Sequence, residues 1–94
     1  MKWAVIPRDE QETIISINYF ERILTVYTSR KSTANRLIKK MGNPNLIHYS
    51  EDFVTGITYE RSLFDKDISK FFSKGLIIGA FRRENIEDDE SAQE

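Results

Sequence analysis

The chain has 94 residues, about the size of one small domain, and 12% of them are aromatic. Disordered chains are poor in aromatic residues, so we expect most of this chain to fold. It contains no cysteine and one histidine, His48, which excludes disulfides, thiolate nucleophiles, cysteine zinc sites and metal sites built from several histidines. The lack of cysteine fits a reducing cytosol.

The formal net charge of −1 conceals two regions of opposite charge. Six of the 15 acidic residues and none of the 14 basic residues lie in residues 84–94. We therefore expect one folded domain over residues 1–83 and a disordered acidic tail over residues 84–94. Two interpretations of the tail stay open: a solubilising terminus, or a tethered polyanion that covers a basic face. Its candidate contact residues are Glu87, Asp88, Asp89 and Glu90.

The apolar runs of the chain are short. Four apolar residues precede Pro7, whereas a signal peptide needs an apolar run of about 7–15 residues. The longest nonpolar run, residues 75–81, is far shorter than the ~20 residues of a membrane helix. The sequence therefore predicts a soluble, cytoplasmic protein with no membrane partner.

The first predicted elements are strands. Residues 2–6 are typical of a short strand that ends at Pro7. Residues 13–19 and 23–28 are rich in β-branched and aromatic residues, so they predict a hairpin with its turn at residues 20–22. Apolar and polar residues alternate from Ile15 to Tyr19, which is typical of a half-buried strand.

A helix is predicted next. Thr28 or Ser29 would cap its start, and it would end before Gly42, with Pro44 just beyond. Its apolar residues recur at the spacing i, i+3, i+4, i+7, which places them on one side of the helix, facing a core. They are Ala34, Leu37, Ile38 and Met41.

The remaining elements repeat this order. Residues 46–50 and 53–59 are predicted strands, and Glu51 and Asp52 form the turn between them. Ser62 would cap a second helix with one apolar face, made of Phe64, Ile68, Phe71 and Phe72. Residues 76–81 are predicted to form a late strand after Gly75.

The two halves of the chain also match each other at an offset of thirty residues. Eight of the 25 pairs from Ile17/Ile47 to Met41/Phe71 are identical, against about two expected from composition. We therefore predict an internal ββα-ββα duplication. The fold class is α+β: an antiparallel sheet of four to six strands with two helices on one face.

Patterns of known catalytic sites are weak in this chain. His48 lies in the middle of a predicted strand, without a nucleophile elbow. Glu51 and Asp52 are typical of a turn, and Asp65 and Asp67 of the start of a helix. The four glycines form no phosphate-binding loop. We therefore expect a non-enzymatic protein with no catalytic residue, metal or cofactor.

Basic residues mark the first helix as a candidate binding surface. Arg36, Lys39 and Lys40 fall on the side opposite its apolar stripe, and residues 30–40 contain no acid. Such a face can neutralise phosphates of a nucleic acid, dock on an acidic protein or pair with the chain's own tail. The sequence leaves these three partners open, as well as a solvated face with no partner.

Tyrosines on the predicted strands form a second candidate surface. They are Tyr19, Tyr27, Tyr49 and Tyr59. With helices on one face of the sheet, tyrosines on the other face would make an exposed platform suited to protein binding. The alternative is that they pack in the core with their hydroxyls at its rim.

Several short motifs resemble those of small hypothetical proteins from prophages and conjugative elements of Gram-positive bacteria. They cover about residues 12–73 and consist of Glu12-Thr13-Ile14, Ile17-Asn18-Tyr19, Tyr27-Thr28-Ser29, Leu37, Lys40 and Gly42. The resemblance implies a non-enzymatic protein of the bacterial cytoplasm that binds a host or phage protein, as inhibitors of host defence systems such as anti-CRISPR proteins do. We expect a monomer or a small homo-oligomer. The alternative is a small nucleic-acid-binding regulator that uses the basic helix.

Overall fold

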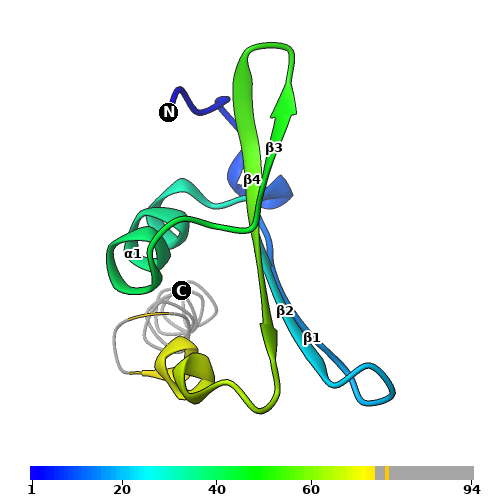
Figure 1. The fold of residues 1–94 in the computed structure, drawn as a ribbon. Coiled ribbons are helices and arrows are strands. Elements are labelled where there is room, and N and C mark those ends of the chain that lie inside the picture. Colours follow the sequence, from blue (N-terminus) through cyan, green and yellow to red (C-terminus); the bar gives the residue numbers. More distant parts are fainter. Residues whose placement is uncertain (74–75, 77–94) are drawn as a thin grey trace, which may run out of the picture.

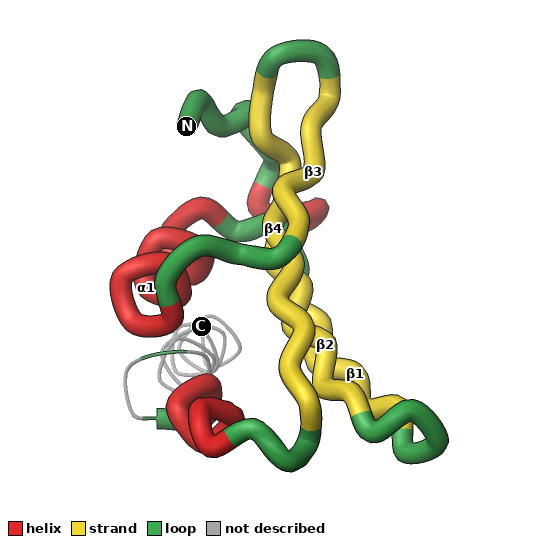
Figure 2. The backbone as a smooth tube through the Cα atoms, viewed as in Figure 1, coloured by secondary structure: helices red, strands yellow, loops and turns green. Residues whose placement is uncertain are grey.

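The segments rich in β-branched and aromatic residues form one antiparallel sheet in a computed structural model, which describes residues 1–73 and 76. The strands stand in the order β1-β2-β4-β3, so the two hairpins meet along β2 and β4 (Figure 1). Figure 2 shows the helical segments of residues 31–41 and 66–72 on one side of this sheet. The elements are η1 (Arg8–Glu10), β1 (Thr13–Asn18), β2 (Ile23–Thr28), α1 (Lys31–Met41), β3 (Leu46–Ser50), β4 (Phe53–Ser62) and η2 (Lys66–Phe72).

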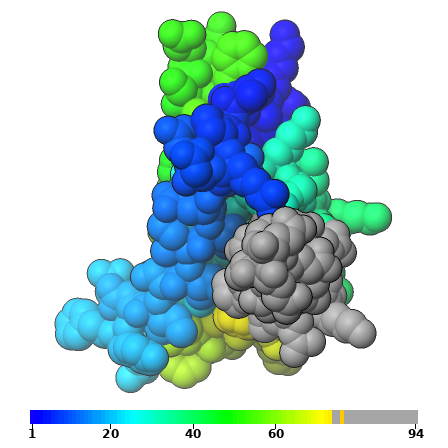
Figure 3. Space-filling view, turned by 180° about the vertical axis from the view of Figure 1, so that it is seen from behind, coloured from blue at the N-terminus to red at the C-terminus, as the bar shows by residue number. Residues whose placement is uncertain are grey.

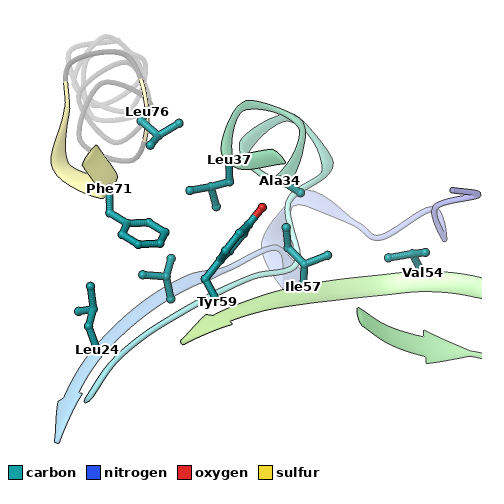
Figure 4. Close-up of a cluster of buried hydrophobic side chains, with 9 residues drawn as sticks. Leu24, Ala34, Leu37, Val54, Ile57, Tyr59, Phe71 and Leu76 are labelled. Atoms are coloured by element: carbon teal, nitrogen blue, oxygen red, sulfur yellow. The ribbon is translucent and has the colours of Figure 1, made fainter. Parts of the chain in front are cut away.

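The side of the sheet that faces α1 and η2, here called the covered face, carries the core. Burial alternates along β2, where Leu24, Val26 and Thr28 are buried and the residues between them are half-buried. Their partners on β4 include Tyr59 and Ile57, which are buried as well. Figure 4 shows Leu24, Ile57 and Tyr59 directed toward the helical segments. The alternation of apolar and polar residues thus gives the sheet one buried face and one open face.

Helix α1 forms where its apolar spacing predicted it. Ala34 and Leu37 are fully buried, and Ile38 and Met41 pack against the core. Gly42 ends the helix with a φ of 82° and donates its N–H to the carbonyl of Ile38, as a helix C-terminus requires. The amphipathic stripe and the glycine stop are confirmed.

The predicted cap of α1 is wrong. Arg30 occupies the N-cap position and makes no side-chain cap bond. The Ser29 hydroxyl instead accepts the N–H of Glu12, and the Thr28 hydroxyl bonds that of Thr13 across the hairpin at 2.9 Å. The hydroxyls of both predicted capping residues therefore hold β1 to the end of β2.

The second helical segment differs from its prediction in both start and shape. β4 pairs with β2 as far as Ser62, so Ser62 belongs to the sheet, and Asp65 caps a 3-10 helix by accepting the N–H of Asp67. The expected apolar face is not shared, because Phe71 is buried while Phe64 is 75% exposed. Phe64 precedes the Asp65 cap, so it lies outside the helix and helical spacing does not apply to it. Within the helix Ile68 and Phe71 are three apart and therefore share the side that packs on the core, while Phe72 is exposed.

The strand predicted over residues 2–6 does not extend the described sheet. Residues 2–6 contribute one parallel bridge, between Trp3 and Val54. From Ile57 onward β2 already pairs with the same edge of β4, so the N-terminal segment cannot form a longer ladder there. The predicted strand over residues 76–81 lies outside the described residues except for Leu76, which is buried. The tail residues 84–94 lie outside them as well.

The internal duplication is not confirmed, whereas the α+β class and the antiparallel sheet are. A register shift between His48 and Tyr49 marks a bulge in the β3-β4 pair. It moves the later residues of β4 to the other face. Thr28 therefore lies on the covered face, and Thr58, its match at an offset of thirty, lies on the open face and bonds His48. Within residues 1–73 and 76, no helix is long and apolar enough to span a bilayer.

Candidate protein-binding surface

β1 is an edge strand of the described sheet, and it is exposed along its whole length. It pairs with β2 on one side only, and all six of its residues are exposed. Three of them are isoleucines whose exposed fractions lie between 39% and 48%: Ile14, Ile15 and Ile17. A long apolar edge of this kind is a template for pairing with another chain.

The position of α1 explains why Ile15 and Ile17 stay exposed. Ile15 and Ile17 lie opposite Val26 and Leu24, so they share the covered face with the core. α1 makes its main sheet contacts with β2 and β4, and it leaves both isoleucines on β1 partly exposed. Their apolar surface therefore continues the core outward to the edge of the sheet.

The backbone groups of β1 alternate between the two sides of the strand. The carbonyl of Glu12 accepts the N–H of Ser29, so Glu12 directs its backbone toward β2. Because ladder bonds alternate in an antiparallel pair, Thr13, Ile15 and Ile17 direct their N–H and C=O groups away from β2. The open edge therefore presents three residues able to continue the ladder.

The edge lacks the features that usually prevent pairing. Edge strands are commonly protected by charged side chains, prolines or bulges. Residues 13–20 contain no charge and no proline, and β1 pairs with β2 in an unbroken register. Nothing within β1 itself would repel an incoming strand.

The tip of the same hairpin adds two exposed rings. Tyr19 is 79% exposed and Phe20 is 96% exposed, and Figure 3 shows this hairpin end projecting from the body of the molecule. The side chain of Asn18 accepts the N–H of Glu21 at 2.9 Å and braces the turn. We call the set Ile14, Ile15, Ile17, Tyr19 and Phe20 the β1 hairpin surface.

The four tyrosines expected to form a platform lie apart. Tyr59 is fully buried on the covered face, and its hydroxyl donates to the carbonyl of Gly42. Burial raises the pKa of Tyr59 to about 12, although the nearby Arg61 guanidinium lowers it somewhat. Tyr27 is half-buried on the open face. Tyr19 and Tyr49 belong to hairpin ends at opposite ends of the sheet (Figure 1).

His48 takes part in a structural cluster on the open face. Its Nε2 lies 2.7 Å from the Thr58 hydroxyl, and its ring meets Tyr27 edge-on with centroids 5.5 Å apart. No group of three potential metal ligands occurs among residues 1–73 and 76. These contacts fasten β3 and β2 to β4 across the bulge.

A hollow of about 390 Å³ lies between the ends of β2 and β4. The side chains that line this hollow contact one another and the surrounding loops. Arg22 covers the Phe64 ring, and the Asn45 amide oxygen accepts both the N–H of Glu60 and one guanidinium N–H of Arg61. These bonds close the part of the β4 edge that β3 does not reach.

The basic residues of α1 lie on its outer side. Lys39 and Lys40 are exposed and Arg36 is half-buried. None of the three makes an ion pair with a described residue. The tail candidates Glu87, Asp88, Asp89 and Glu90 lie outside the described residues.

Ile14, Ile15, Ile17 and Phe20 were missed by the sequence analysis. The alternation along β1 correctly indicated one apolar face, but it is equally typical of a central strand. The eight uncharged residues 13–20 were the available signal. That signal becomes informative once the strand order places β1 at the edge.

No family model, no curated protein and no solved structure matches this chain.

Proposed function

We propose that this chain is a non-enzymatic protein-binding module that accepts a strand of a polypeptide along β1. The observation that carries the proposal is the uncharged edge strand with three exposed isoleucines. Strand addition obtains affinity from main-chain hydrogen bonds and selectivity from alternate side chains. The outward backbone groups of Ile15 and Ile17 provide the main-chain hydrogen bonds. Their side chains, together with those of Tyr19 and Phe20, provide the selectivity.

A proline at position 15 tests the proposal. Ile15→Pro removes one outward N–H and adds a ring at the open edge, while the hydrogen bonds that hold β1 to β2 come from its neighbours. Ile15→Thr is the matched control, since it keeps the N–H and the β-branch. We expect Ile15→Pro to abolish capture of partner protein by the tagged full chain, and Ile15→Thr to keep most of it.

The capture is run from a bacterial lysate with nuclease present, with bound proteins identified by mass spectrometry and folding of each variant checked by circular dichroism. Equal capture by the wild type and folded Ile15→Pro would contradict the proposal. The resemblance of residues 12–73 to proteins of mobile elements supports a Gram-positive lysate as the source. A component of a host defence system is the partner class we propose on that basis.

A nucleic-acid-binding regulator is the second candidate. The observation in its favour is the outward placement of Lys39 and Lys40 on a helix without acids. Phosphate contacts release counterions, so each contact makes the affinity fall more steeply with salt. We expect Arg36→Glu/Lys39→Glu/Lys40→Glu to remove a steep salt dependence of binding to duplex DNA or RNA. A flat salt response of the wild type would exclude this function.

A further inference from the structure

We infer that the strand taken up by β1 is β1 of a second copy, paired antiparallel about a two-fold axis at Ser16. This inference rests on the proposed function, because the second copy uses the same edge of β1, and any other partner strand competes with it for that edge. The result is one continuous sheet of eight strands across two chains. Most soluble homo-oligomers are closed by such a two-fold axis, which brings the same surface of both subunits together.

Symmetry restricts the register of this pairing. In an antiparallel pair, directly opposite residues lie on the same face of the sheet. A two-fold axis that keeps both covered faces on one side must therefore place a residue opposite itself. With Ser16 opposite Ser16 of the second copy, Ile15 lies opposite Ile17 of the second copy and Ile17 opposite Ile15. Four isoleucines then form a continuous apolar row.

The free backbone groups fit this register. Ile15 and Ile17 direct their N–H and C=O groups to the open side. In the Ser16 register they form the hydrogen-bonded pairs of the new ladder. The register therefore satisfies the unpaired edge groups and the apolar side chains together.

The ends of the strand are complementary as well. The same register sets Tyr19 opposite Thr13 of the second copy and Phe20 opposite Glu12, so the two most exposed rings of the hairpin cover the start of the other β1. The uncharged residues 13–20 add no repulsion between the copies.

The size of the contact sets the expected affinity. A six-residue strand is roughly 20 Å long. We therefore expect the contact between two such strands to be smaller than a standard interface, which buries about 800 Å² on each partner. We therefore expect a reversible dimer with a dissociation constant on the order of micromolar. Such a dimer is visible in sedimentation experiments at ordinary protein concentrations.

Charges at Ser16 provide the test. Ser16 is exposed and lies on the open face, so Ser16→Lys and Ser16→Glu should each leave the fold intact. Either substitution alone places two like charges opposite each other at the axis, which should weaken the dimer by ~10-fold or more. An equal mixture of the two variants pairs Lys with Glu and should restore a dimer. The matched controls are Ser50→Lys and Ser50→Glu on the opposite edge strand, β3.

Sedimentation velocity over a range of concentrations gives the outcome. Dimers of the wild type and the mixture, monomers of each Ser16 variant and unchanged Ser50 variants support the inference. It is overturned if the wild type stays monomeric up to millimolar concentration, if Ser16→Lys dimerises like the wild type, or if the mixture remains monomeric. A monomeric wild type that still captures a protein through β1, with loss in Ile15→Pro, would leave the proposed function standing without this inference.

Discussion

Tyr27 lies so close to Gly56 that position 56 has no room for a side chain. A Cβ on Gly56 would come 2.8 Å from Cε1 of Tyr27 and 3.1 Å from the carbonyl oxygen of Thr28. The ring of Tyr27 lies over the central strand β4 and meets His48 of β3 edge-on. The glycine therefore permits three neighbouring strands to be joined on the open face.

Gly56→Ala should destabilise the protein by about 1–3 kcal/mol, the usual cost of forcing an extra methyl group into a packed site. Urea denaturation measures this loss. In a Tyr27→Ala background the nearest obstacle is gone, so the same substitution should cost clearly less. An equal loss in both backgrounds would show that the ring is not the cause.

Tyr59 should make the stability depend on pH in the alkaline range. Its pKa is raised from 10.0 to about 12 in the folded chain. Its contribution is therefore fully present below pH 10 and is lost as the pH rises toward 12, with a slope of up to about 1.4 kcal/mol per pH unit. Tyr59→Phe should flatten this slope and cost about 0.5–1.5 kcal/mol at neutral pH, because the bond to the Gly42 carbonyl is lost.

Denaturation at several pH values, with tyrosine ionisation followed by ultraviolet absorbance, compares the two proteins. Tyr19→Phe is the matched control, because Tyr19 is 79% exposed and its ring lies at the hairpin tip. The same alkaline slope in the wild type and in Tyr59→Phe would contradict the assignment.

Phe71 and Phe64 should respond very differently to truncation. Phe71 is fully buried and meets Tyr59 edge-on at 5.6 Å, so Phe71→Ala should cost about 3–5 kcal/mol. Phe64 is 75% exposed, with the Arg22 guanidinium over its ring, so Phe64→Ala should cost less than about 1 kcal/mol. Thermal denaturation separates these results, and similar losses would favour the shared apolar face that the sequence predicted.

Glu51→Gly should stabilise the β3-β4 hairpin. Glu51 has a φ of 57°, and it is the first of two turn residues between Ser50 and Phe53. Glycine adopts this conformation without steric cost and is preferred at that position of such turns. We expect a gain of about 0.5–1 kcal/mol in the free energy of unfolding. Asp52→Gly is the control, and an equal gain there would contradict the explanation.

Local chemistry made the elements of this fold predictable. The strand segments, the turn at Glu51 and Asp52, the stripe of α1 and its stop at Gly42 depend on neighbours within a few residues. Such features can be recognised from the spacing of apolar residues and from the positions of glycine, which adopts conformations that other residues avoid. The same reasoning failed at Ser29, because its hydroxyl bonds Glu12. It failed at Ser62 because the backbone of Ser62 pairs with Ile23 of β2. Both partners are distant in the sequence.

The candidate site was much less predictable. Arg36, Lys39 and Lys40 could be placed on the outer side of α1, because helical periodicity alone decides this. The tyrosine platform does not form, since Tyr59 faces the helices and Tyr27 the open side. The face of each ring depends on strand register, and one bulge near His48 reverses the pattern along β4.

The sequence by itself determined the α+β class, the antiparallel hairpins and the absence of cysteine chemistry, since these follow from composition and local periodicity. Only the tertiary structure decided that β1 stands at the edge of the described sheet and that α1 packs mainly on β2 and β4. An apolar strand has the same sequence pattern whether it is central or at an edge. Strand order is settled by contacts between residues far apart in the chain, and no local pattern encodes them.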